Sequence, residues 1–288
     1  MKPVAFEYCR PDTLAEAVQL LQTFGAEASL LSGGMSLGAM LNMRLVRPTA
    51  LIDLKRVQGL DTIEYHTQAV RTGATLRQAD ALNDAKLMAS LPLLALALPW
   101  VGHYQTRNRG TLGGSVAHAD PSSEIPLVLL TLGGEVELQS ARGVRRVAAQ
   151  DFFLDILTTA RAPDELISAL HWPIASTQCG NGFGEIAQRH GDFAIVACAA
   201  QVQLSADGLL IALRVGLGGV ESRPLLADVS RFIGQRADTQ LAQHIAHAAA
   251  QACSPMSDIK ASADYRRALV QTLGAQVIQQ AFQSVGGR

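Results

Sequence analysis

The stretch Leu30-Leu31-Ser32-Gly33-Gly34-Met35-Ser36-Leu37 is an apolar run that breaks into a pair of glycines followed by a hydroxyl residue. Two successive glycines can adopt positive φ without a Cβ penalty, so their backbone N–H groups can converge on an anion. A second copy, Arg109-Gly110-Thr111-Leu112-Gly113-Gly114-Ser115, follows about eighty residues later. The paired loops predict a site for a phosphate or diphosphate group.

The better-known phosphate-binding motifs do not fit these loops. No Gly-x-Gly-x-x-Gly opens a helix, and Gly33 to Gly38 is followed by Ala39-Met40 where a P-loop has Lys-Ser/Thr. Neither loop contains a lysine, so binding is expected to rest on backbone N–H groups and nearby hydroxyls. These hydroxyls belong to Ser32, Ser36, Thr111 and Ser115. An added Cβ at a paired glycine should therefore matter more than the loss of any one side chain.

Longer segments around both loops resemble one protein family. Ser32–Leu37 continuing into Leu41–Pro48, together with Arg107–Gly114, is similar to the FAD-binding medium subunit of the molybdenum hydroxylases. This group includes carbon monoxide dehydrogenase, quinoline- and nicotine-type dehydrogenases and the flavin domain of xanthine dehydrogenase. Arg189–Val196 and Ser262–Arg267 also match, so the resemblance covers nearly the whole chain.

The resemblance implies an α+β fold with two domains. We expect a two-lobed FAD-binding domain of the vanillyl-alcohol-oxidase and p-cresol-methylhydroxylase type at residues 1–175, with lobes at about 1–55 and 56–175. A smaller C-terminal α+β domain, with an antiparallel sheet and helices, is expected at residues 178–288.

The resemblance also implies where the cofactor binds. The two glycine loops would enclose the FAD pyrophosphate, Glu124 would lie near the ribose of the adenosine half, and Leu166 and Ile167 would pack on the flavin system. Glu124 could equally be an ordinary first-turn helix acid, and the two apolar residues could equally be core. The expected cofactor-binding residues are Leu31, Ser32, Gly33, Gly34, Met35, Ser36, Leu37, Thr111, Gly113, Gly114, Ser115, Glu124, Leu166 and Ile167. No catalytic residue and no metal ligand is expected in this chain.

One position departs from the family pattern. Many relatives carry a lysine shortly after the aromatic residue that corresponds to Phe183, whereas this chain has Gly184-Glu185. A basic contact to the flavin end of the cofactor is therefore in doubt.

The function implied by the resemblance is electron transfer within a larger enzyme. The chain would collect electrons from two [2Fe–2S] clusters in a small partner subunit and pass them through FAD to an external acceptor. A large subunit would hold molybdenum–molybdopterin, in a dimer of heterotrimers. The alternatives are a stand-alone FAD-dependent oxidase or dehydrogenase, and a non-catalytic assembly protein with the same fold. The substrate, whether a nitrogen heterocycle, carbon monoxide or another molecule, stays open, as does the acceptor.

Composition supports a globular protein that does not bind nucleic acid. The 288 residues are 48% hydrophobic and 17% charged, with a formal net charge of −1, so a clustered basic face is not expected. The four cysteines are scattered without a Cys-x-x-Cys pair, which favours reduced thiols over a metal site. No apolar run has the length of a membrane span and no signal peptide is apparent, so a cytoplasmic location is expected.

Local patterns predict several element boundaries. Thr13 and Glu16 form a capping box for an amphipathic helix, Thr75 and Gln78 are expected to cap another, and Asp120-Pro121 is expected to start a helix that reaches Leu132. Ser176–Gly182 is small, polar and glycine-rich and is expected to be a linker. Beyond it the pattern predicts strands over 193–204 and 209–217 and helices over 238–252 and 261–283.

Overall fold

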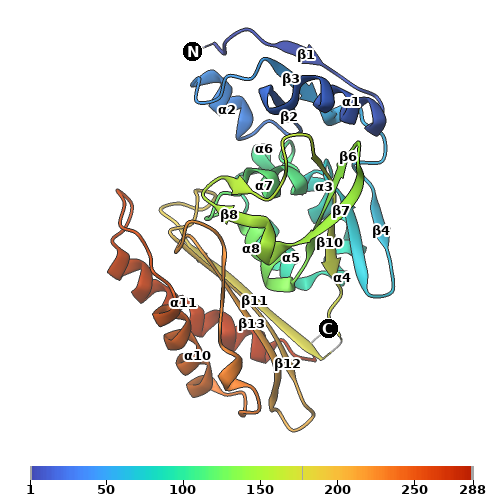
Figure 1. The fold of residues 1–288 in the computed structure, drawn as a ribbon. Coiled ribbons are helices and arrows are strands. Elements are labelled where there is room, and N and C mark those ends of the chain that lie inside the picture. The colour runs from blue at the N-terminus through green and yellow to red at the C-terminus, as the bar shows by residue number, and fades with distance from the viewer. Residues whose placement is uncertain (1, 177, 287–288) are drawn as a thin grey trace.

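The structure, a computed structural model, describes residues 2–176 and 178–286. Its N-terminal lobe is built on a three-stranded parallel sheet in the order β1-β3-β2 (Figure 1). Helix α1 buries Ala17, Val18 and Leu21 against this sheet, and the predicted capping box between Thr13 and Glu16 is confirmed. The lobe consists of β1 (Glu7–Cys9), α1 (Leu14–Phe24), β2 (Ala28–Leu31), α2 (Leu37–Asn42) and β3 (Ala50–Asp53), with 3-10 turns at Gly25–Glu27 and Leu54–Arg56.

The second lobe contains a five-stranded antiparallel sheet in the order β4-β5-β10-β6-β7. Helix α8 is buried along all 9 of its residues because it lies between this lobe's sheet and the C-terminal sheet (Figure 1). The strands are β4 (Ile63–Tyr65), β5 (Ala69–Gly73), β6 (Glu135–Ser140), β7 (Gly143–Ala148) and β10 (Leu166–Pro173), and β8 (Phe153–Asp155) and β9 (Thr158–Thr159) form a small hairpin. The helices are α3 (Gln78–Asn83), α4 (Ala85–Ser90), α5 (Pro92–Ala97), a 3-10 turn at Leu98–Trp100, α6 (Tyr104–Arg107), α7 (Leu112–His118), α8 (Glu124–Leu132) and α9 (Ala149–Phe152).

The C-terminal part is a four-stranded antiparallel sheet in the order β11-β12-β13-β14. Helices α10 and α11 cover one face of this sheet, and α5 and α8 of the second lobe cover the other (Figure 1). The elements are β11 (Cys179–Ile186), β12 (Val196–Leu204), β13 (Leu210–Gly218), β14 (Leu225–Ala227), a 3-10 turn at Ser230–Phe232, α10 (Thr239–Ala252) and α11 (Ala263–Gln283). This arrangement of helices and antiparallel strands confirms the expected α+β class.

The expected linker at Ser176–Gly182 is wrong in its second half. Strand β11 already begins at Cys179, and Thr177 lies outside the described residues. Gly180 and Gly182 are in the strand because helix α11 lies so close that a Cβ at either glycine would overlap a carbonyl oxygen of that helix. These glycines therefore allow close packing and do not provide a hinge.

Two predicted helix starts are also wrong. Helix α8 begins at Glu124 and not at Pro121, since the Asp120 carboxylate accepts a hydrogen bond from the Ser122 N–H and holds a turn there. Helix α3 begins at Gln78, and Thr75 does not cap it. The Gln78 amide instead donates to the Ser115 hydroxyl at 3.0 Å.

Among the described residues, no helix combines the length and the apolar character needed to cross a membrane.

The packing of β11 on α11 leads to a stability prediction. Gly182→Ala should lower the free energy of unfolding by about 3 kcal/mol, the upper end for an overpacked core, because its Cβ meets the backbone carbonyl of Val277. Gly184→Ala is the matched control. Its Cβ would lie 3.1 Å from Leu273 Cδ1, a side-chain atom that can shift, so a loss below about 1 kcal/mol is expected. Urea unfolding measures both, and equal midpoints would contradict the argument.

Candidate cofactor site

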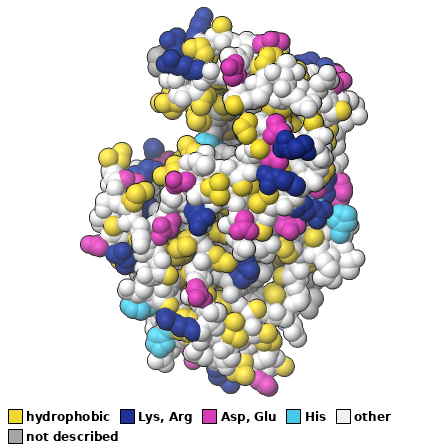
Figure 2. Space-filling model, viewed as in Figure 1, with side chains coloured by type: hydrophobic (Ala, Val, Ile, Leu, Met, Phe, Trp, Pro, Cys, Tyr) yellow, Lys and Arg dark blue, Asp and Glu magenta, His cyan; other side chains and the backbone are white. Residues whose placement is uncertain are grey.

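One cavity of about 530 Å³ lies where the N-terminal lobe, the second lobe and the C-terminal sheet meet. Figure 2 shows the hollow between the N-terminal lobe and the rest of the molecule. Both glycine loops line it, and so does the loop that joins β11 to β12, through Gly191, Asp192 and Phe193. The cavity is thus assembled from three parts of the chain that are distant in sequence.

Most of the residues predicted for the site are in the cavity wall. The wall includes Ser32, Gly33, Gly34, Met35, Ser36, Leu37, Thr111, Gly113, Gly114, Ser115, Glu124 and Ile167. Leu31 and Leu166 are not among the lining residues. Leu166 is fully buried and packs with the core of the N-terminal lobe, so its side chain is a core residue there.

The first glycine loop has the form of an anion cradle. Gly34 has φ of +72°, which a residue with a Cβ rarely adopts, and the chain then enters α2 at Leu37. Across the described residues, the five consecutive backbone N–H groups of residues 33–37 have no acceptor within the protein. Such groups at a turn that leads into a helix are suited to bind the oxygens of a diphosphate.

The second glycine pair works differently, and the expectation of a second cradle is wrong. Gly113 and Gly114 lie inside the first turn of α7, and neither has positive φ. Their N–H groups are already used, because Gly113 donates to the Ala74 carbonyl and Gly114 to the Thr111 hydroxyl, each at 3.0 Å. An ideal Cβ at Gly113 would lie 2.6 Å from Ala74 Cα, so this glycine is required by helix-to-strand packing.

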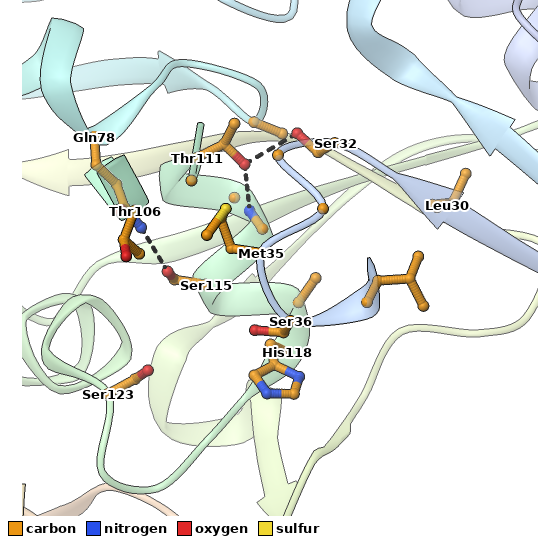
Figure 3. Close-up of a pocket in the computed structure, with 18 of the residues that line it drawn as sticks. Leu30, Ser32, Met35, Ser36, Gln78, Thr106, Thr111, Ser115, His118 and Ser123 are labelled. Atoms are coloured by element: carbon orange, nitrogen blue, oxygen red, sulfur yellow. Dashed lines mark hydrogen bonds between the residues drawn. The ribbon is translucent and has the colours of Figure 1, made fainter. Parts of the chain in front are cut away.

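The second loop contributes hydroxyl groups and braces the first loop. The hydroxyls of Ser32 and Thr111 are 3.0 Å apart, and Figure 3 shows these side chains pointing toward each other. Gly33 lies against the backbone of residues 109–110, where an ideal Cβ would be 2.9 Å from Gly110 Cα. Gln78 orients Ser115 from the opposite side (Figure 3). The free N–H groups of residues 33–37 are therefore held in place by residues 109–111, which lead into helix α7.

Few charged side chains line the cavity. The basic side chain there is Arg161, whose guanidinium donates to the Ala162 and Glu165 carbonyls and whose pKa is lowered by burial. His118 also has a pKa below its usual value, because it is half-buried. No lysine is among the described residues that line the cavity. An anion held here is therefore bound mainly by neutral donors.

Two buried glutamates lie on either side of the domain junction, near enough that the charge of one affects the other. Burial raises the pKa of Glu124, at the start of α8, to about 7, and the negative charge of Asp120 adds to the effect. Burial also raises the pKa of Glu185, on β11, to about 8, and the charge of Glu124 contributes. Neither carboxylate oxygen of Glu185 has a hydrogen-bond partner among the described residues. The departure noted at Gly184-Glu185 thus places an unpaired acid where the family pattern leads one to expect a base.

Sequence reasoning missed several residues of the cavity wall. Gln78, Arg161 and the loop at 191–193 line it, as does the segment Val101-Gly102. For the loop at 191–193, the sequence signal is the family resemblance at Arg189–Val196. Gln78 and Arg161 reach the cavity only through tertiary packing, which no local pattern indicates.

Glu185 should make stability depend on pH. The unfolded chain loses this proton near pH 4.5, whereas the folded chain keeps it up to about pH 8, so folding is penalised increasingly as pH rises between the two values. Glu185→Gln removes the penalty, and its melting temperature should exceed that of the wild type by a margin that grows from pH 5 to pH 9. Exposed Glu7→Gln is the control. A margin for Glu185→Gln that is the same at both pH values would contradict the burial argument.

Family models match nearly all of the chain. The FAD binding domain in molybdopterin dehydrogenase matches residues 4–175, and the CO dehydrogenase flavoprotein C-terminal domain matches residues 182–281. The first of these alone covers more than half of the sequence.

Individual relatives align from end to end. The nicotine 6-hydroxylase medium subunit of Paenarthrobacter nicotinovorans is 39% identical over 98% of this chain and 99% of the relative. The carbon monoxide dehydrogenase medium chain of Hydrogenophaga pseudoflava is 31% identical over 100% of this chain and 99% of the relative. The crystal structure of quinoline 2-oxidoreductase from Pseudomonas putida 86 superposes with a TM-score of 0.95 at 35% identity, over 99% of this chain and 100% of that one. The chain therefore belongs to the family of FAD-binding medium subunits of the molybdenum hydroxylases.

Proposed function

We propose that this chain collects electrons from [2Fe–2S] clusters in a small partner subunit and passes them through FAD to an external acceptor. The observation that carries the proposal is the row of five N–H groups at residues 33–37 that have no acceptor among the described residues and lie at the cavity, within the part of the chain that matches the FAD-binding domain. A large subunit would hold molybdenum–molybdopterin and the substrate. Relatives named as the medium subunit of a hydroxylase and the medium chain of a dehydrogenase support this assignment of roles to three subunits.

The residues present fit FAD. The pyrophosphate would accept hydrogen bonds from the N–H groups of residues 33–37 and from the hydroxyls of Ser36 and Thr111. Glu124 can interact with a sugar hydroxyl, and Ile167 offers apolar surface. When bound, FAD supplies the redox chemistry by accepting electrons one or two at a time. The chain's own share is to bind the cofactor, orient it and limit the access of water.

We place the isoalloxazine ring toward the loop at 191–193. Phe193 is an aromatic residue of the cavity wall that is still 50% exposed, so this end of the cavity communicates with the surface. Electrons have to enter and leave the flavin through partners outside the chain, which favours this end. The residues at the other end include Ala28, Leu30 and Leu54 of the N-terminal lobe, which would accommodate the adenine.

Three further features belong to the same proposal. The assembly would be a dimer of heterotrimers. The location would be cytoplasmic, which four free cysteines support. The domains would divide at residues 1–175 and 178–288, with lobes at about 1–55 and 56–175, and the separate family matches at residues 4–175 and 182–281 support the division into two domains.

Thr111 tests the role of the hydroxyls. Thr111→Ala removes the oxygen that caps Gly114 and contacts Ser32, each at 3.0 Å. We expect a stability loss of about 1 kcal/mol and a roughly tenfold weaker affinity for FAD, measured by quenching of flavin fluorescence. Thr111→Ser retains the oxygen and should bind FAD as the wild type does. Equal FAD affinity of both variants would show that the hydroxyl is not used.

Purification of the intact enzyme tests the subunit role. Under mild conditions from the native host, this chain should be accompanied by a larger, molybdenum-containing chain and a smaller, iron-containing chain. Acid precipitation should release yellow FAD into the supernatant, because no covalent link is expected. A native mass that shows this chain alone, combined with reduction of its flavin by a small substrate, would favour the stand-alone oxidase or dehydrogenase. A chain without flavin would favour the assembly protein.

A further inference from the structure

Arg266 is a buried arginine in the first turns of α11, with only 5% of its surface exposed. Its guanidinium donates to the carbonyls of Ile195 and Gly219 and to the carboxylate of Asp258, the latter two at 2.8 Å. The three acceptors belong to three separate loops. A planar guanidinium can bridge them simultaneously, and a lysine ammonium cannot reproduce that geometry.

The first of these loops is the one that enters the cofactor cavity. Gly191, Asp192 and Phe193 line the cavity, and Ile195, which Arg266 binds, follows two residues later. The two ends of the loop are joined by a hydrogen bond from the Ile195 N–H, just before β12, to the carbonyl of Ile186, the last residue of β11, at 2.7 Å. Arg266 thus holds the point where the cavity loop joins strand β12.

The opposite side of the same loop rests on the second lobe. The rings of His190 and Trp100 stack with their centroids 5.4 Å apart. Gly191, with φ of +86°, is so close to His103 that an ideal Cβ would lie 2.7 Å from its ring. The cavity loop is therefore held between the second lobe and Arg266, and its position depends on both.

The second acceptor connects Arg266 to another part of the cavity wall. The Gly219 N–H donates to the Pro121 carbonyl at 2.8 Å, and Ser123 and Glu124, two and three residues after Pro121, line the cavity. An ideal Cβ at Gly219 would lie 2.7 Å from the Ile195 carbonyl oxygen, so the two loops are in close contact. One guanidinium accordingly fixes the cavity loop relative to the segment that carries Glu124.

The third acceptor is itself held in place. Asp258 accepts hydrogen bonds from the backbone N–H groups of Lys260 and Ala261 at 2.9 and 3.0 Å, which together with Arg266 lower its pKa. The carboxylate therefore carries a charge that pairs with the buried guanidinium. This pairing keeps Arg266 oriented toward the two loop carbonyls.

We propose that Arg266 is a positioning residue that sets the loop at 191–193 against the flavin end of bound FAD. The inference rests on the proposed function, in particular on the placement of the isoalloxazine toward this loop. Arg266 acts through the carbonyls of Ile195 and Gly219 and does not line the cavity itself. A displaced loop would change the surroundings of the flavin without removing any group that touches the pyrophosphate.

The test compares two adjacent arginines in the full chain loaded with FAD. Arg267 is the matched control, since it forms an ion pair with the exposed Asp264 at 3.3 Å and, within residues 2–176 and 178–286, makes no hydrogen bond to a loop that lines the cavity. We expect Arg266→Lys to weaken FAD binding roughly tenfold, to change the visible circular dichroism of the flavin and to shift its reduction potential. Arg267→Lys should leave all three unchanged. Asp258→Asn removes the charge that pairs with the Arg266 guanidinium, so it should change the flavin spectrum in the same direction. This variant replaces Arg266→Lys in the test if Arg266→Lys fails to fold.

Two results would overturn the inference. If the Arg266 and Asp258 variants lower the melting temperature but leave the flavin dichroism and potential as in the wild type, Arg266 only stabilises the fold. If the wild-type chain takes up no FAD, the proposed function fails first, and the inference fails with it. The wild-type measurement therefore distinguishes the two failures.

Discussion

Anion binding in the cavity depends on five consecutive backbone N–H groups, at residues 33–37, that have no acceptor in the part of the chain that the structure describes. A diphosphate carries negative charge, and the wall of this cavity offers no lysine among the described residues to neutralise it. Donors fixed by the fold can replace a cation because hydrogen bonds to an ionised acceptor are about twice as strong as neutral ones. The geometry of the loop thus takes over the role that a charged side chain has in a P-loop.

A row of free donors is useful only if it keeps its shape without the ligand. The N–H groups of residues 33–37 cannot stabilise the loop themselves, because they must stay available, although the Gly34 carbonyl accepts a hydrogen bond from the Gly38 N–H at 2.9 Å. Its shape is imposed from outside, by the Ser32–Thr111 contact and by the backbone of residues 109–110 that lies against Gly33. The first glycine loop therefore supplies the free donors, and residues 109–111 of the second loop fix their position.

This division explains what the sequence could and could not predict. The capping box at Thr13 and Glu16 is local, and it was predicted correctly. Both glycine pairs were located, but they look alike in sequence, whereas one provides positive φ at Gly34 and the other allows close packing of Gly113 on Ala74. The partner that decides between these roles lies far away in the chain. The same limit applies to β11, whose glycines resemble a linker until helix α11 is placed against them.

The domain junction borders the cavity and contains a buried acid within an apolar core. Phe183, Ala197 and Ala199 of the C-terminal sheet join the core of the second lobe, and Glu185 lies on the same face as Phe183. A charged carboxylate there would lack a partner and would repel Glu124, so the junction packs best with the proton retained. Glu124, whose pKa is also raised by burial, lines the cofactor cavity. A proton retained on Glu185 therefore allows close packing of the two domains and spares Glu124, in the cofactor site, a neighbouring negative charge.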